Sequence, residues 1–173
     1  MTAPVSVHAS AVLVGNRAVL IRGPSGAGKS RLAFDLVLAG RSGQIPKAVL
    51  VGDDRVHLDT HDGEIVVRPA RELAGLIEIR GLGIRRCEFA GAATVGLVVD
   101  LCAADAERLP PPEALQTRIY GVQLPRIPVG PGYAALPLVV AALTMTASSS
   151  SVSPSADCSK GIGNHISPTL ATE

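Results

Sequence analysis

Aromatic side chains are scarce in this sequence. It has no Trp, two Phe and two Tyr, so that aromatic residues make up 2% of the chain. Single-stranded nucleic acid is usually held on several stacked rings, and such a platform is therefore not expected. Without rings, the core has to be filled by Val, Leu, Ile and Ala, which suit buried strands flanked by helices. The composition thus favours an α/β fold.

Clustered positive charge is also missing. Lys and Arg total 16 against 15 Asp and Glu, which gives a formal net charge of +1. Nucleic acids and anionic membrane surfaces are bound through basic blocks, and the sequence has none. It therefore predicts neither a nucleic-acid nor a membrane partner, although a basic patch assembled only by folding remains an open alternative.

No apolar run is long enough to span a bilayer. The longest, residues 134–145, has about a dozen residues and contains Pro137, whereas a spanning helix needs roughly 20. The N-terminal segment lacks a basic stretch before its apolar residues, so it does not resemble a secretory signal. We therefore predict a cytoplasmic protein.

Cysteine is too rare for a disulfide framework. The chain has Cys87, Cys102 and Cys158, an odd number without CxxC spacing. This pattern argues against both paired disulfides and a zinc cluster. We interpret all of them as free thiols.

Glycine and proline, 18 and 13 residues, punctuate the apolar runs and mark the turns between elements. An edge position is expected for residues 122–129, because their prolines cannot donate to a strand ladder. The first expected elements are a hairpin over 5–14 and 18–21, whose second strand leads into a glycine loop, and a helix that ends at Gly40 as its C-cap. A strand over 48–51, a hairpin over 56–58 and 65–67, and a strand running into a glycine-hinged loop over 76–84 follow. The last elements are a central strand over 93–101, the edge strand and a helix over 134–145. We predict one domain over residues 1–145, followed by a Ser-rich, disordered tail over residues 146–173.

The pattern GxxxxGK[ST] follows the apolar strand that ends at Arg22. Glycines let the backbone N–H groups surround phosphate oxygens, the lysine reaches the β- and γ-phosphates, and the hydroxyl binds Mg²⁺. Chance would produce the fixed positions in under about 1% of chains of this length, so an incidental glycine-rich turn is the weaker alternative. The predicted ATP-binding residues are Gly23, Pro24, Ser25, Gly26, Ala27, Gly28, Lys29 and Ser30.

Two adjacent carboxylates, Asp53 and Asp54, follow the apolar strand over 48–51. Sites of α/β proteins lie at the carboxyl ends of strands, and neighbouring side chains there point in different directions. One carboxylate can therefore face a metal while the other faces an incoming hydroxyl. A turn with two solvated aspartates is the alternative, and Asp100, which ends another apolar strand, is a rival metal ligand.

Two further positions carry polar side chains within apolar strands. His8 lies between Val7 and Ala9, where a histidine is more often a core residue than a catalytic one. Glu78 and Arg80 alternate with isoleucines and share one strand face, which solvent contact alone would explain.

The order and spacing of these motifs resemble the catalytic domain of the HPr kinase/phosphorylase family over residues 5 to about 143. The glycine loop alone would fit many nucleotide-binding proteins, whereas the motif that begins at Glu78 is specific to that family. The matching segments are Val7-His8-Ala9, the loop from Gly23 to Ser30, Asp53-Asp54-Arg55-Val56 and Glu78-Ile79-Arg80-Gly81-Leu82-Gly83-Ile84.

The resemblance implies a P-loop-containing fold similar to that of phosphoenolpyruvate carboxykinase. It implies a kinase that uses ATP and Mg²⁺ to phosphorylate a serine of an HPr-type phosphocarrier protein, and a homo-hexamer. By the same resemblance, Lys29 binds the phosphates, Ser30 and Glu78 bind the metal, and Asp54 is the catalytic base, with Asp53 and His8 supporting it. The family also removes the phosphate with inorganic phosphate.

The sequence departs from the family in several places. The family's N-terminal domain is absent, the segment over 41–47 is longer and is expected to be a surface insertion, and the Ser-rich tail replaces the last helices. Tyr133 stands where the family has an arginine, for which Arg126 or Arg118 are candidate substitutes. We therefore expect weak phosphorylase activity. A nucleotide-sensing regulator without turnover is the main alternative, and a small-molecule kinase is a weaker one.

Overall fold

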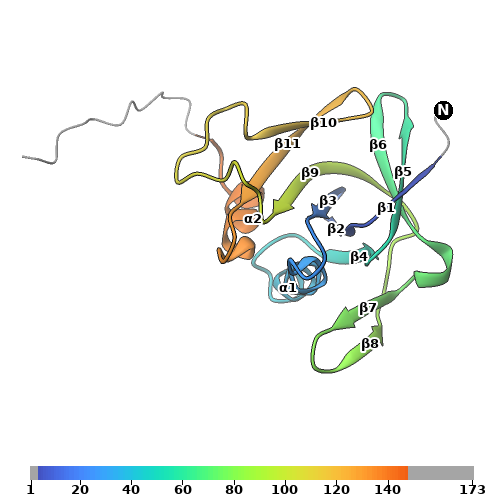
Figure 1. Cartoon of the computed structure of the whole chain (residues 1–173). Helices are drawn as coiled ribbons and strands as arrows, with labels where there is room; N and C mark the ends of the chain where they lie inside the picture. The colour runs from blue at the N-terminus through green and yellow to red at the C-terminus, as the bar shows by residue number, and fades with distance from the viewer. Residues whose placement is uncertain (1–3, 148–173) are drawn as a thin grey trace, which may run out of the picture.

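The computed structural model describes residues 4–147, and within them most strands belong to one curled, nine-stranded sheet (Figure 1). The predicted tail lies outside the described residues apart from Thr146 and Ala147. The strands are β1 (Val5–Val7), β2 (Ser10–Val14), β3 (Arg17–Arg22), β4 (Ala48–Gly52), β5 (Val56–His61), β6 (Glu64–Pro69), β7 (Leu76–Ile79), β8 (Gly83–Arg86), β9 (Ala93–Leu101), β10 (Gln116–Ile119) and β11 (Val122–Val129). The helices are α1 (Lys29–Arg41), the 3-10 helix η1 (Arg71–Leu73) and α2 (Ala135–Thr144).

Strand β9 is the centre of the sheet, as its apolar run predicted. It pairs in parallel with β3 and, along its last residues, with β11, whereas its first residues pair antiparallel with β6. The order through the sheet is β1-β5-β6-β9-β3-β2-β4, with β11 beside β9 and β10 beside β11. Because β9 has neighbours of both orientations, it joins the parallel strands β3 and β11 to the antiparallel hairpin β5–β6.

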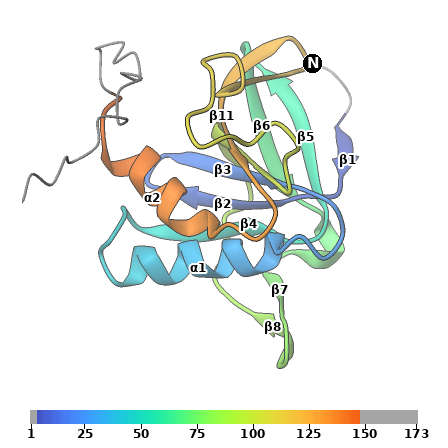
Figure 2. The ribbon, with the colours of Figure 1, turned by 60° about the vertical axis from the view of Figure 1, so that its left-hand side comes forward.

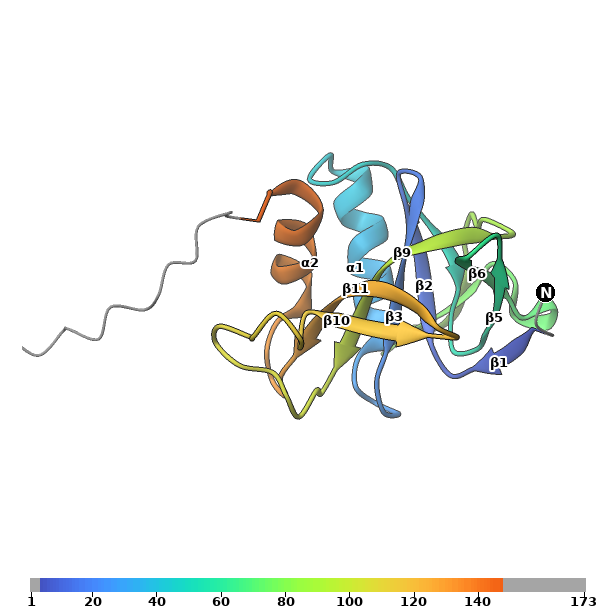
Figure 3. The same cartoon turned by 90° about the horizontal axis from the view of Figure 1, so that it is seen from above.

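Both faces of the central strands are buried, which explains their continuous apolar sequences. Side chains alternate between two core clusters: Val19 and Ile21 of β3 face the helices, whereas Ala18 and Leu20 face the cluster that includes β5 and β6. Seen from above, α1 and α2 lie on one side of β2 and β3, and β5 and β6 lie on the other (Figure 3). Figure 2 shows α1 and α2 lying next to each other.

The predicted hairpins β2–β3 and β5–β6, the strand, loop and helix unit, and the last helix are confirmed. Strand β11 has two neighbours along its length: β10 pairs with residues 122–125 and β9 with residues 126–129. Each half therefore has one neighbour and one unpaired side, which agrees with the prediction that its prolines confine it to an edge position. The segment over 41–47 is mostly exposed, as predicted, but Ile45 is buried in the core.

The structure also bears on the predictions for the cysteines and for membrane-spanning helices. Cys87 and Cys102 are free thiols, as predicted, whereas Cys158 lies outside the described residues. Within residues 4–147, neither helix is long and apolar enough to cross a membrane.

Gly40 was expected to cap α1, but the helix continues to Arg41 and Ser42 is the cap. The glycine serves close packing instead, because α1 lies directly against β4. A Cβ atom on Gly40 would lie 2.6 Å from the backbone nitrogen of Ala48 and 2.7 Å from its Cβ.

A network of ion pairs joins the ends of the parallel strands. The carboxylate of Asp100 accepts hydrogen bonds from Arg22 Nε (2.6 Å), Arg22 Nη2 (2.7 Å) and Arg126 Nε. The guanidinium of Arg126 also donates to both oxygens of Asp105, at 2.6 and 2.9 Å. Burial by itself would raise the pKa of Asp100, but the hydrogen bonds from both arginines outweigh it and lower the pKa.

Asp100 is therefore a structural residue, and its interpretation as a rival metal ligand is wrong. Its oxygens are occupied by two guanidinium groups, which no cation would replace without leaving the arginines unpaired. The side chain of Arg126 is only 13% exposed and is held between two carboxylates, so it does not substitute for the family's missing arginine either.

Replacing Gly40 with Ala should lower the free energy of unfolding by about 1–2 kcal/mol, because displacing α1 from β4 costs more than the ~1 kcal/mol gain in helix propensity. Urea denaturation measures this change. Gly91→Ala is the matched control, since a Cβ there meets nothing within 4 Å, and it should change stability by less than about 0.5 kcal/mol. Equal stability of the two variants would contradict the packing argument.

Asp100→Asn should lower the free energy of unfolding by about 1–3 kcal/mol at pH 7, because half-buried Arg22 loses its carboxylate partner and Arg126 keeps only Asp105. The folded-state pKa of Asp100 is lowered, so its stabilisation is complete above the unfolded-state pKa of about 3.9 and is lost as the pH falls through the folded-state value. The difference between wild type and variant should therefore shrink below about pH 4. Urea denaturation between pH 7 and 3 tests this, and an altered Mg²⁺ requirement with unchanged stability would restore the metal-ligand interpretation.

Candidate active site

The glycine loop, residues 23–28, connects the end of β3 to the first turn of α1. Gly23, Gly26 and Gly28 have φ angles of 152°, 78° and 95°, which side-chain-bearing residues rarely adopt. A Cβ on Gly23 would also lie 3.1 Å from the carbonyl oxygen of Leu101. Gly28 caps α1 without a side-chain hydrogen bond, so the first N–H groups of the helix remain available to an anion.

Lys29 is the first residue of α1 and is only 6% exposed. Its Nζ donates hydrogen bonds to the carbonyl oxygens of Gly23 and Pro24, each at 2.9 Å. These contacts hold the ammonium against the loop, where its charge favours a bound phosphate. Gly23 and Pro24 thus act by positioning the lysine.

The loop forms one wall of a cleft of about 1040 Å³. Predicted site residues from four separate segments line this cleft: His8, the loop from Ser25 to Ser30, Asp54 and Glu78. Arg80 and Tyr133 line it as well. The structure therefore brings together residues that are far apart in the chain: Glu78 lies 70 positions after His8, and Tyr133 lies 125 positions after it.

The two adjacent aspartates differ sharply in environment, as their strand-end position predicted. Asp53 is 3% exposed and accepts hydrogen bonds from Ser10 Oγ at 2.6 Å and from the backbone N–H of Glu78 at 3.1 Å. The side chain of Asp54 is 67% exposed, and Oδ1 lies 3.2 Å from Nε2 of His8. Asp53 therefore joins its segment to β2 and β7 and does not face a metal in the cleft, whereas the side chain of Asp54 lines the cleft.

Asp54 has a φ angle of 65°, which is uncommon for a residue other than glycine. Aspartate is among the side-chain-bearing residues that adopt this region most readily, and Asp62 in the β5–β6 turn does so as well. The conformation turns the carboxylate of Asp54 out of the core and into the cleft.

His8 is not a core residue, so the interpretation drawn from its apolar neighbours is wrong. The apolar run breaks at this position: β1 pairs with β5, whereas β2 pairs with β3 and β4. His8 occupies the bend between β1 and β2, and its side chain is 51% exposed. The bend directs the imidazole toward Asp54.

Glu78 and Arg80 reach the cleft because of the hairpin β7–β8, which projects from the main sheet (Figure 1). Ile77 on the opposite face of β7 is buried against the helices, so the predicted alternation is confirmed. Glu78 and Arg80 are exposed and line the cleft that also contains the glycine loop.

Ser10 was missed in the sequence, although it fixes Asp53. It is fully buried at 0% exposure in the otherwise apolar β2. A buried hydroxyl needs a hydrogen-bond partner, so a lone serine inside an apolar strand was the available signal. Its partner lies 43 positions away and could not be read from local pattern.

A family model described as the HPr Serine kinase C-terminal domain matches residues 1–159. The chain is 38% identical over 140 residues to an HPr kinase/phosphorylase of Geobacillus thermodenitrificans, which covers 73% of this chain and 43% of the relative. It is 44% identical over 80 residues to one from Streptococcus thermophilus, covering 46% and 24%. The chain therefore spans less than half the length of these curated relatives.

A solved structure described as the Hpr(Ser) kinase/phosphatase from Coxiella burnetii is also similar. It superposes with a TM-score of 0.63 at 25% identity and covers 80% of this chain and 92% of that one. The α/β fold with its curled sheet is thus shared with that structure. Together with the match of the family model over most of its length, this shows that the chain belongs to the HPr serine kinase C-terminal domain family.

Proposed function

We propose that this chain is an ATP- and Mg²⁺-dependent kinase that phosphorylates a serine of an HPr-type phosphocarrier protein. The observation that carries the proposal is the exposed carboxylate of Asp54, paired with His8 on the cleft that also contains Lys29. Phosphoryl transfer needs a phosphate cradle and a base that accepts the hydroxyl proton. The cleft offers both on facing segments.

The proposed reaction follows from this arrangement. The loop N–H groups and Lys29 hold the β- and γ-phosphates of ATP, and the serine hydroxyl approaches from the side of Asp54. As the bond from serine oxygen to the γ-phosphorus forms, the bond to the ADP oxygen breaks and the proton passes to Asp54. His8 keeps the carboxylate oriented, and Asp53 keeps the segment in place.

Ser30 and Glu78 would hold the metal ion. Both line the cleft, and hydroxyl and carboxylate oxygens suit Mg²⁺. No cluster of three or more acidic, His or Cys side chains that could hold a metal occurs within residues 4–147. That fits a metal bound by few side chains together with substrate phosphates. When bound, Mg²⁺ neutralises charge on the phosphates.

We further propose the P-loop-containing fold class similar to phosphoenolpyruvate carboxykinase and a hexameric assembly, both of which follow from the family resemblance. We also propose a cytoplasmic location, which rests on the sequence patterns described above. The reverse reaction with inorganic phosphate is proposed to be weak. Tyr133 is 76% exposed in the cleft and offers no positive charge to a second phosphate.

A regulator that binds nucleotide without turnover is the second candidate. Tyr133 favours this candidate, because a tyrosine in place of the family's arginine removes a cation from the cleft. The two candidates differ in their need for Asp54: a kinase requires its carboxylate, whereas a regulator requires only the phosphate-binding residues.

Asp54→Asn should reduce transfer of labelled γ-phosphate from Mg-ATP to HPr-type carriers of the source organism by about 10²–10⁴-fold, because the proton acceptor is lost. Nucleotide binding, measured by calorimetry, should persist. Lys29→Ala should instead weaken ATP binding itself. The matched control is Asp62→Asn, since Asp62 is an exposed aspartate with a φ angle of 51° outside the cleft.

Normal nucleotide binding without transfer to any HPr-type carrier by the wild-type chain would overturn the kinase proposal. It would favour the regulator if Lys29→Ala abolished binding of a partner and Asp54→Asn did not.

Glu78→Gln should raise the Mg²⁺ concentration needed for half-maximal transfer at least about tenfold, because an amide binds Mg²⁺ less strongly than a carboxylate. The backbone N–H that bonds to Asp53 is retained in this variant. Transfer rates over a Mg²⁺ titration measure the effect. Glu113→Gln, in an exposed loop away from the cleft, is the control, and an equal response of both variants would exclude Glu78 as a ligand.

A further inference from the structure

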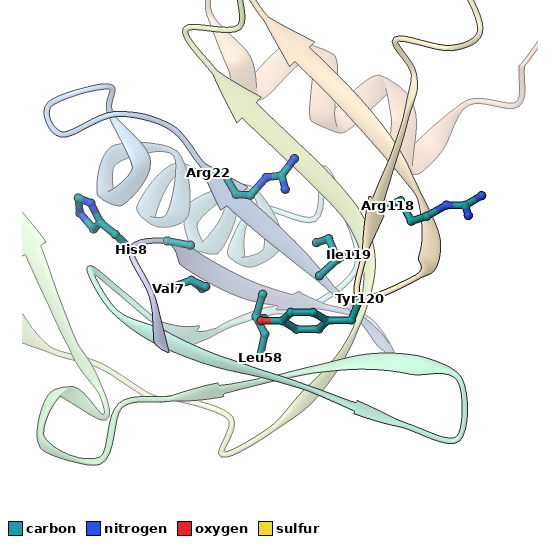
Figure 4. Close-up of a pocket in the computed structure, with 8 residues that line it drawn as sticks. Val7, His8, Arg22, Leu58, Arg118, Ile119 and Tyr120 are labelled. Carbon is teal, nitrogen blue, oxygen red and sulfur yellow. The ribbon is translucent and has the colours of Figure 1, made fainter. Parts of the chain in front are cut away.

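A second cavity of about 320 Å³ lies beside the cleft, between β1, β5 and the β10–β11 hairpin (Figure 4). We call it the side pocket. Its walls are formed mainly by apolar groups of Val7, Leu58, Ile119 and Tyr120. Its volume is at the lower end of the range for ligand pockets, about 300–1,000 Å³, so it suits a small occupant.

The charged residues of the side pocket do not favour an anion as occupant. The guanidinium of Arg22 is bound to Asp100 and also donates to Thr117 Oγ1. Arg118 points away from the apolar walls in Figure 4. Because neither cation is presented to the centre of the pocket, its chemistry selects an apolar group.

Tyr120 is held there in an unfavourable backbone conformation. Tyr120 and Gly121 form the two-residue connection between β10 and β11, with φ angles of 46° and 83°. Turns of this kind favour Asn-Gly or Asp-Gly, and the other two-residue connection with two positive φ angles, Asp62-Gly63 between β5 and β6, follows that rule. A bulky residue in this conformation is a genuine outlier.

The ring of Tyr120 nevertheless adds little to the core. The residue is 43% exposed, and Figure 4 shows its ring extending toward Leu58 across the side pocket. Backbone strain is concentrated at binding and catalytic sites. The strained turn thus carries a ring that lines the side pocket and is not part of the core clusters.

The side pocket adjoins the proposed catalytic base through a single residue. His8 lines both the side pocket and the cleft, and its Nε2 lies 3.2 Å from Asp54. A protein whose serine reaches Asp54 therefore lies against a surface that continues through His8 to the side pocket.

We infer that the side pocket binds an apolar side chain of the acceptor protein, from a residue close to the phosphorylated serine, and thereby contributes to acceptor selection. This inference rests on the proposed function. It assigns to Tyr120 a role in binding the acceptor, separate from nucleotide binding and from proton transfer.

The test uses the full chain and measures binding of the HPr-type carrier by calorimetry in the presence of a non-hydrolysable ATP analogue. Tyr120→Asn should weaken carrier binding at least about tenfold, as expected for truncation of an interface aromatic. It should leave thermal stability equal or higher, because Asn-Gly suits the turn. Asp62→Asn, in the matching turn, should change neither quantity. Val7→Asp, which places a charge in the pocket, should also weaken binding.

Unchanged carrier affinity in Tyr120→Asn, or no binding of the carrier by the wild-type chain, would overturn the inference. A change in oligomeric mass in place of carrier affinity would overturn it too, because the occupant would then be a second copy. If the carrier binds, depends on Tyr120 and yet is not phosphorylated, the inference holds and the proposed kinase activity fails.

Discussion

The candidate site depends on one buried carboxylate. Asp53 directly follows β4. Its carboxylate accepts hydrogen bonds from the hydroxyl of Ser10 in β2 and from the backbone N–H of Glu78 in β7. An unsatisfied buried carboxylate would be costly, so these hydrogen bonds fix the relative positions of the strands. His8 precedes β2, Asp54 follows Asp53, and Glu78 carries the N–H. Asp53 therefore positions His8, Asp54 and Glu78, although its own side chain does not line the cleft.

Neighbouring side chains also distinguish Asp100 from Asp54. Asp100 ends β9 at the edge of the sheet where α/β sites lie, yet two arginines neutralise it and join β3, β9 and β11. Asp54 has only a histidine beside it and remains exposed. The difference follows from the partners that folding brings, because a carboxylate between guanidinium groups is a poor proton acceptor.

Two positions with positive φ, Asp54 and Tyr120, flank His8 on opposite sides, one in the cleft and one in the side pocket. In both, a side chain other than glycine is held toward a recess rather than into the core. The proposed function assigns the first to proton transfer and the inference assigns the second to the acceptor protein. Backbone strain on both sides of one histidine thus agrees with a single surface for catalysis and recognition.

The sequence by itself determined the local units: the glycine loop between β3 and α1, the hairpins, the central strand β9, and the different directions of the adjacent side chains of Asp53 and Asp54. These depend on spacing and side-chain periodicity, which neighbouring residues define. The tertiary structure alone decided that His8 leaves the core, that Asp100 pairs with two arginines, that the two halves of β11 pair with different strands and that Gly40 lies against Ala48. Each of these outcomes depends on a partner far away in the chain, and no local pattern specifies such a partner.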